Sequence, residues 1–132
     1  ARYALGGAGT TTSALAFGGD NPRTAITESW NGSAWSEVAD LNTARYALAG
    51  FGSSNTSALA VGGFNPPFAN ETESWDGTSW TEIANLATAR QQLRGSGSTA
   101  AAFVAGGITP SKTTATEEWT VSSFTTKTFD TD

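Results

Sequence analysis

The 132-residue sequence contains no cysteine, no histidine and no methionine, and only 14% of its residues are charged. Without cysteine the chain has no disulfide, no thiolate nucleophile and no soft metal ligand. Without histidine it also lacks the commonest metal ligand and the usual general base. The sequence therefore predicts a domain that uses no cofactor and no metal ion.

Positive charge and long apolar runs are scarce as well. Seven Lys and Arg residues stand against twelve Asp and Glu residues, which gives a net charge of −5. The seven form no basic stripe that would neutralise phosphates, so nucleic acid is not an expected partner. No apolar run approaches the roughly 18 residues that span a bilayer, and membrane insertion is not expected.

Small residues dominate what remains. Ala, Thr, Ser and Gly supply 72 of the 132 residues, yet five Trp, seven Phe and short aliphatic runs provide enough apolar mass for a core. Low-complexity tails lack such mass and stay disordered. This composition favours tightly packed β-structure.

A repeat of about 44 residues organises the chain. Four features recur in register, one in each copy: the diglycines 18–19, 62–63 and 106–107; the first aromatics Trp30, Trp75 and Trp119; the second aromatics Trp35, Trp80 and Phe124; and the arginines Arg2, Arg45 and Arg90. Three copies, at about 1–43, 44–88 and 89–132, fill the single domain 1–132 and leave no room for a separate catalytic domain.

Each copy carries four short segments with strand character. In the middle copy the first segment begins at Arg45, and the other three cover residues 57–61, just before the diglycine, 71–75 and 80–84. Alternating or continuous apolar patterns of this length indicate strands, and helical periodicity is absent. The segment 64–70 carries two prolines and is predicted to be a loop.

A tight turn is predicted between the last two strands. Asp76 and Gly77, matched by Asn31 and Gly32, favour a type I′ hairpin because these residues tolerate left-handed backbone conformations. In the third copy Val121 and Ser122 replace this pair, so we expect the loosest hairpin there. Four antiparallel strands in each copy predict an all-β fold of three propeller blades, half of a six-bladed ring.

The middle copy resembles the kelch repeat. Its diglycine at 62–63, its segment 73–77, Trp80 and its segment 86–90 match a diglycine, a Tyr-Asp-Pro-like turn, a Trp and a Met-Pro-x-x-Arg-like link. Trp replaces Tyr and Gly replaces Pro in the turn, which affects packing detail more than fold. The Ala/Thr/Ser-rich style also resembles kelch-like repeats in large virion proteins of marine bacteriophages. These resemblances imply a virion or extracellular location.

The kelch resemblance implies a non-catalytic platform that binds a protein or a glycan. In that family partners often dock on the face built from the loops between the second and third strands and from the links between blades, near which Arg2, Arg45 and Arg90 lie. The corresponding residues are Asn21 and Arg23 in the first copy, Phe64, Asn65, Phe68 and Asn70 in the second, and Thr109 and Lys112 in the third. Phe64 and Phe68 flank two prolines, and aromatic side chains on rigid loops make contacts at low entropic cost.

The first strand of the third copy differs from the other two. After its arginine it reads Gln91, Gln92, Leu93 and Arg94, where the first two copies read Tyr-Ala-Leu followed by Gly or Ala. The resemblance places this strand along the central channel, so the polar patch is a candidate ligand site. A terminal repeat that solvates an exposed position is the alternative.

Enzymatic activity is not expected. Glu28, Glu73 and Glu117 recur one repeat apart, so their environments are equal, whereas a glycosidase needs two carboxyl groups in unequal environments. Pairing of each glutamate with a repeat arginine is the favoured role. A sialidase-like propeller glycosidase and a purely architectural spacer remain the alternative functions.

Closure is the remaining question, because three blades do not complete a ring of about four to eight. If each end face holds about 500 Å² of apolar surface, its exposure forgoes on the order of 12 kcal/mol. We therefore expect no lone three-blade monomer. The chain begins inside a repeat, which suggests a piece of a longer protein. A homodimer closed head to tail twice, or further blades of a longer parent chain, would cover the faces.

Overall fold

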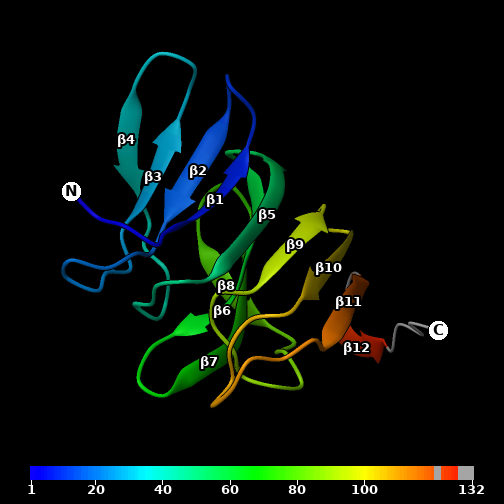
Figure 1. Ribbon diagram of the computed structural model, residues 1–132. Helices are drawn as coiled ribbons and strands as arrows, with labels where there is room; N and C mark the ends of the chain where they lie inside the picture. Colours follow the sequence, from blue (N-terminus) through cyan, green and yellow to red (C-terminus); the bar gives the residue numbers. More distant parts are fainter. Residues whose placement is uncertain (121–122, 128–132) are drawn as a thin grey trace.

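The computed structural model describes residues 1–120 and 123–127, and this part of the chain contains twelve β-strands and no helix (Figure 1). The first sheet contains β1 (Gly6–Gly9), β2 (Ala14–Phe17), β3 (Thr27–Trp30) and β4 (Trp35–Val38). The second contains β5 (Ala49–Ser54), β6 (Ser57–Phe64), β7 (Phe68–Trp75) and β8 (Trp80–Ile83). The third contains β9 (Arg94–Gly97), β10 (Ala101–Ala105), β11 (Thr116–Thr120) and β12 (Ser123–Lys127).

Each sheet is an antiparallel meander in which consecutive strands are neighbours. The predicted all-β fold, with four strands in every copy, is therefore confirmed. The three sheets are not closed into a ring. The expected looseness of the hairpin at residues 121–122 lies outside the described residues.

The first strand of each sheet begins later than the sequence predicts. In the middle copy it begins at Ala49 instead of Arg45. The cause is Ala47, whose φ of 54° places it in the left-handed region and breaks the alternation of side chains. Ala4 and Gln92 occupy the same position in the other copies, with φ of 54° and 55°.

The second and third strands of the middle sheet are longer than predicted. β6 continues through the diglycine to Phe64, with a register shift between Val61 and Gly63, and β7 already begins at Phe68. The predicted loop 64–70 is thus wrong except for residues 65–67. Both prolines lie in this short turn, so neither removes a hydrogen bond from the ladder.

The core lies between consecutive sheets. One cluster joins the first and second sheets, and it includes Phe17, whose ring meets that of Trp80 edge to face at 4.9 Å. A second cluster joins the second and third sheets around Leu59, Val61 and Trp119. Most of the apolar burial therefore comes from stacking sheet on sheet.

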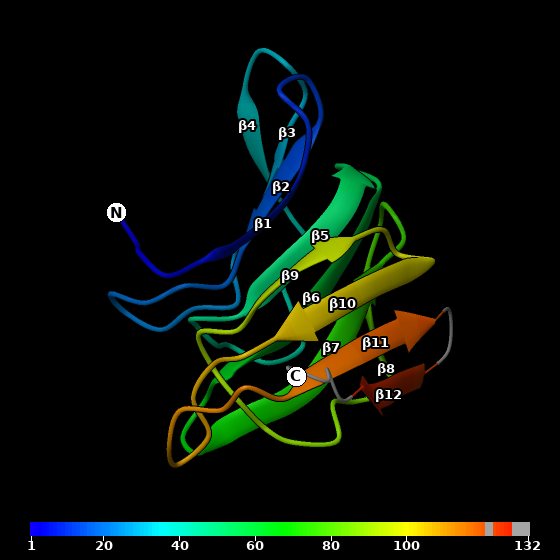
Figure 2. The same cartoon turned by 45° about the vertical axis from the view of Figure 1, so that its right-hand side comes forward.

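The first strands of the three sheets lie side by side, with β1 beside β5 and β5 beside β9 (Figure 2). Gly50 permits the closest approach, because a Cβ atom there would collide with the backbone of Gly7 in the neighbouring sheet. Glycine is required at this position by the distance between sheets.

Backbone hydrogen bonds also run from sheet to sheet, and we call them the backbone latch. Ala47 donates its N–H to the carbonyl of Ala4 at 2.7 Å, and Gln92 donates to Ala47 at 2.8 Å. The second glycine of the first two diglycines donates to the arginine carbonyl of the following copy, Gly19 to Arg45 and Gly63 to Arg90, both at 2.9 Å. The diglycines and the left-handed residues thus connect neighbouring copies.

Candidate functional site

The repeated arginines and glutamates form ion pairs inside the sheets. Arg45 Nη2 lies 3.1 Å from Glu73 Oε1, and Arg90 Nη2 lies 2.6 Å from Glu117 Oε1. These side chains are at most 2% exposed. Burial lowers the pKa of Arg45, and the negative charge of Glu73 opposes that shift. The favoured pairing of arginine with glutamate is thus present in the structure.

Each buried pair also holds the link that enters its sheet. Glu73 Oε2 accepts the backbone N–H of Asn42 at 2.8 Å, and Glu117 Oε2 accepts that of Ala87 at 2.9 Å. Arg45 Nη1 donates to the carbonyl of Glu71 at 2.8 Å. The carboxylates are therefore engaged by the protein itself.

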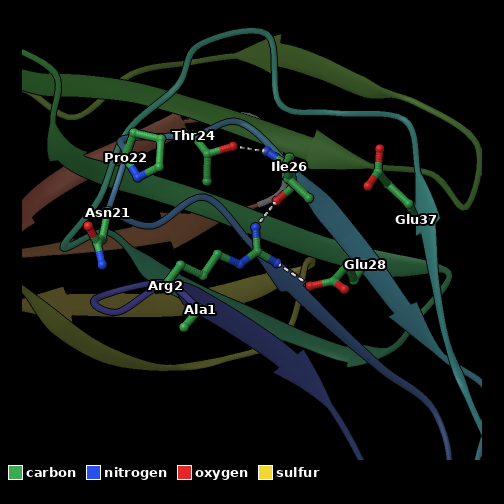
Figure 3. Close-up of a pocket in the computed structure, with 8 residues that line it drawn as sticks. All are labelled: Ala1, Arg2, Asn21, Pro22, Thr24, Ile26, Glu28 and Glu37. Atoms are coloured by element: carbon green, nitrogen blue, oxygen red, sulfur yellow. Dashed lines mark hydrogen bonds and ion pairs between the residues drawn. The ribbon is translucent and has the colours of Figure 1, made fainter.

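The corresponding pair in the first sheet is open to solvent. Arg2 Nη2 lies 2.7 Å from Glu28 Oε2, and the Glu28 side chain is 41% exposed. The pair borders a pocket of about 370 Å³, which Asn21 and Glu37 also line (Figure 3). In the other two sheets a backbone N–H of the entering link, that of Asn42 or Ala87, bonds the corresponding glutamate.

The loops between the second and third strands lie along one edge of the molecule, which we call the loop edge (residues 18–26, 65–67 and 106–115; Figure 1). Phe64 stands between two aromatic rings there. Its centroid is 5.5 Å from that of Tyr46 and 5.5 Å from that of Phe68, and the second contact is edge to face. Such pairs contribute about 0.5–1.5 kcal/mol beyond area burial.

Tyr3 holds in the first copy the repeat position of Tyr46, and it lies beside Asp20 of the loop edge. Its ring is 57% exposed, and its hydroxyl donates to Asp20 Oδ2 at 3.2 Å. The carboxylate of Asp20 raises the pKa of the Tyr3 hydroxyl, and Tyr46 adds to the shift. We call the contacting rings of Tyr46, Phe64 and Phe68, together with Tyr3, the aromatic cluster. Sequence reasoning missed both tyrosines, although they share one repeat position with Gln91.

The predicted loop residues divide by environment. Asn21, Arg23 and Lys112 are exposed, and Phe64, Asn65, Phe68, Asn70 and Thr109 are half-buried. Asn70 Nδ2 donates to the carbonyl of Leu86 at 3.3 Å, and Thr109 Oγ1 donates to that of Ser111 at 3.0 Å. Thr109 thus supports its loop, and Asn70, which lies in β7, holds the segment at Leu86. Phe64 and Phe68 belong to the aromatic cluster.

The polar residues predicted as a patch in the third copy differ in their environments. Gln91 is half-buried and bridges to Ile108, while Gln92 is exposed and takes part in the backbone latch. Arg94 opens β9 and borders a shallow groove of about 190 Å³ that follows the first strands of the sheets. Of the three residues, Arg94 is the one that faces this groove.

Three observations concern ligands and relatives. No group of three or more acidic side chains suited to a metal ion forms within residues 1–120 and 123–127. The same residues contain no helix long and apolar enough to cross a membrane. No family model and no curated protein matches the chain.

Proposed function

We propose that the chain is a non-catalytic recognition module whose three sheets are consecutive kelch-like propeller blades. The repeated interface supports the arrangement as blades, because the same latch bonds join the first sheet to the second and the second to the third. Adjacent first strands, apolar sheet-on-sheet packing and one sheet for each repeat are typical of a propeller.

The aromatic cluster is the observation that carries the binding function. Tyr3 presents an exposed ring beside a carboxylate, and Phe64 is fixed between Tyr46 and Phe68. Rigid rings with nearby hydrogen-bonding groups suit the apolar faces and hydroxyls of a sugar, and they also suit a protein surface. We favour a glycan as ligand, because Asp20 and Asn65 supply polar groups next to the rings.

The place of action follows from the resemblance alone. An Ala/Thr/Ser-rich kelch-like module with this exposed edge fits a virion or extracellular adhesive protein. The buried state of Glu73 and Glu117 favours recognition over glycoside hydrolysis, since a catalytic carboxyl group must reach its substrate.

A glycan array with the wild-type chain tests the proposal. We expect binding to a defined set of glycans, and a loss of about tenfold or more for Tyr3→Ala and Phe68→Ala. Tyr3→Phe is the matched control, because it keeps the ring and removes only the hydroxyl bond to Asp20. Binding that both alanine variants retain in full would remove the aromatic cluster from the site. If the wild-type chain binds no ligand, the proposed binding function is wrong and an architectural spacer is the remaining role.

A further inference from the structure

We propose that the outer face of the first sheet docks onto the outer face of the third sheet in a second copy of this chain, with Trp35 inserted into the cavity of that sheet. The inference rests on the proposed arrangement of the sheets as blades, and it is independent of the ligand at the loop edge. Two such contacts join two copies into a ring of six sheets.

The interior interface shows how one sheet receives the next. Trp80 of the second sheet is 5% exposed, stacks against Phe17 of the first sheet and donates its indole N–H to Thr27 Oγ1 at 3.0 Å. An indole thus fills the apolar space above β2 and satisfies a buried hydroxyl group of β3. The contact of Trp80 with Phe17 and Thr27 serves as the model for the contact between the two outer faces.

In the first sheet Trp35 occupies the position that Trp80, the donor of the indole N–H, occupies in the second sheet. It pairs with Trp30 across the hairpin as Trp80 pairs with Trp75, yet it is 49% exposed. No acceptor for its indole N–H exists in the described part of the chain.

The outer face of the third sheet carries the counterparts of the residues that surround Trp80 in the interior interface. Thr116 begins β11 as Thr27 begins β3, and Phe103 takes the place of Leu15. Both residues line a cavity of about 410 Å³, whose rim includes the ion pair of Lys127 with Glu118 at 3.3 Å. Phe103 is 47% exposed. The cavity therefore offers an apolar wall and a hydroxyl acceptor to an incoming indole.

The backbone latch is incomplete at the same two faces. The N–H groups of Ala4 and Gly107 have no acceptor among residues 1–120 and 123–127, although their counterparts Ala47 and Gly63 are bonded across sheets. Extending the latch by one step places the Ala4 N–H on the Gln92 carbonyl of the other copy. The same step places the Gly107 N–H on the Arg2 carbonyl. The two faces are thus complementary in their hydrogen bonds.

Steric fit points to the same contact. Gly7 corresponds to Gly50, whose missing Cβ lets β5 approach the preceding sheet. A Cβ atom on Gly7 would find the carbonyl of Leu15 at 3.5 Å as its nearest neighbour, which is an ordinary contact. Within one chain nothing requires glycine there, whereas a sheet stacked on β1 does.

A second copy is the occupant that these features select. Each chain carries one donor face and one acceptor face, so two chains make two identical contacts. The second contact forms within an already joined pair and benefits from a high effective concentration. A face-to-face dimer through two Trp35 residues would leave Phe103 and Gly107 unused.

Light scattering during size-exclusion chromatography tests the dimer at micromolar concentration. We expect twice the 13.6 kDa of one chain. Trp35→Ala and Phe103→Ala should each raise the dissociation constant by about thirtyfold or more, as expected for a truncated central aromatic residue. Gly7→Ala should fold normally, because its Cβ has room, and should raise the dissociation constant by about tenfold or more.

Circular dichroism reports folding of every variant, and Phe68→Ala serves as the control that should remain dimeric. A folded wild-type monomer of 13.6 kDa would overturn the inference. So would a dimer that Phe103→Ala and Gly7→Ala leave intact. Glycan binding lost in Tyr3→Ala within an intact dimer, or a dimer lost with glycan binding kept, separates this inference from the proposed function.

Discussion

The same ion pair occurs in all three copies, but its exposure differs. Arg45 with Glu73 and Arg90 with Glu117 are buried, whereas Glu28 beside Arg2 is 41% exposed. The recurrence of arginine and glutamate predicts the pairing, since both repeat in register. The segments that neighbour each ion pair in the stack decide which pair is exposed to solvent. A repeat pattern contains no information about these neighbours.

Removal of the arginine should therefore cost different amounts in different copies. Arg45→Ala leaves the buried Glu73 carboxylate without its counter-charge, and we expect a loss of about 3–5 kcal/mol in unfolding free energy. Arg2→Ala breaks a solvent-screened pair and should cost about 1 kcal/mol or less. Urea unfolding of both variants at one protein concentration makes the comparison. Equal losses would contradict it.

One buried hydroxyl group has no partner, and the repeat explains why. Thr72 Oγ1 is buried without a hydrogen bond, although the equivalent Thr27 Oγ1 accepts one from Trp80. In the third copy Phe124 takes the position of Trp80 and has no N–H to donate. The orphaned group results from this single departure from the repeat.

Phe124→Trp should restore the missing bond and stabilise the chain by about 1 kcal/mol, because an unsatisfied buried polar group costs about 1–3 kcal/mol. Trp80→Phe should produce the opposite change, since it orphans Thr27 Oγ1. Thermal unfolding of both variants gives the two shifts. A Phe124→Trp variant less stable than wild type would indicate that the larger ring does not fit.

At the level of the strands, sequence reasoning succeeded where local chemistry decides. Asp76 Oδ1 accepts the N–H groups of Thr78 and Ser79, both at 2.8 Å, and Asn31 Oδ1 does the same for Ser33 and Ala34. A hairpin at this place was predictable because a side chain within the turn makes it. The predicted type I′ conformation is wrong, because four residues separate the paired Trp75 and Trp80 and only Gly77 of the two predicted left-handed residues has a positive φ, of 99°. The start of β5 could not be predicted, because the left-handed φ of Ala47 is imposed by the backbone latch, which joins this repeat to the neighbouring repeats of the chain.

The hairpin bonds make a pH-dependent contribution. The N–H groups of Ser79 and Thr78 lower the pKa of Asp76 below its ordinary value of 3.8. A carboxyl group with a lowered pKa stabilises the fold above its unfolded pKa and loses this contribution as pH falls through the lowered value. Asp76→Asn should keep the turn, as Asn31 does, and remove this part of the acid sensitivity. Unfolding midpoints below pH 4 that fall equally in both chains would contradict it.

For the molecule as a whole, the spacing between sheets restricts side chains at the first strands. Gly50→Ala should destabilise the chain by about 1–3 kcal/mol, because its Cβ atom meets the backbone of Gly7. Gly7→Ala is the matched control for folding, since its nearest neighbour lies at 3.5 Å. Unfolding curves at a concentration where neither variant associates compare the two. A Gly50→Ala chain as stable as Gly7→Ala would contradict the close approach.

The stack itself was predictable in outline, because one sheet for each repeat leaves apolar faces that only other sheets can cover. The aromatic cluster was predictable only in part. Phe64 and Phe68 stand out beside two prolines, but Tyr3 and Tyr46 occupy a position that a strand pattern assigns to the interior. Their place at the loop edge depends on the left-handed residue that follows each of them, Ala4 or Ala47.

Amide hydrogen exchange of the folded chain, followed residue by residue by NMR, tests the stacking of the sheets most directly. The amides of Gly19, Ala47, Gly63 and Gln92 bond across sheets, and we predict slow exchange at all four. Fast exchange at these amides, beside slow exchange within β2, β6 and β10, would describe sheets that form without stacking and would contradict the account.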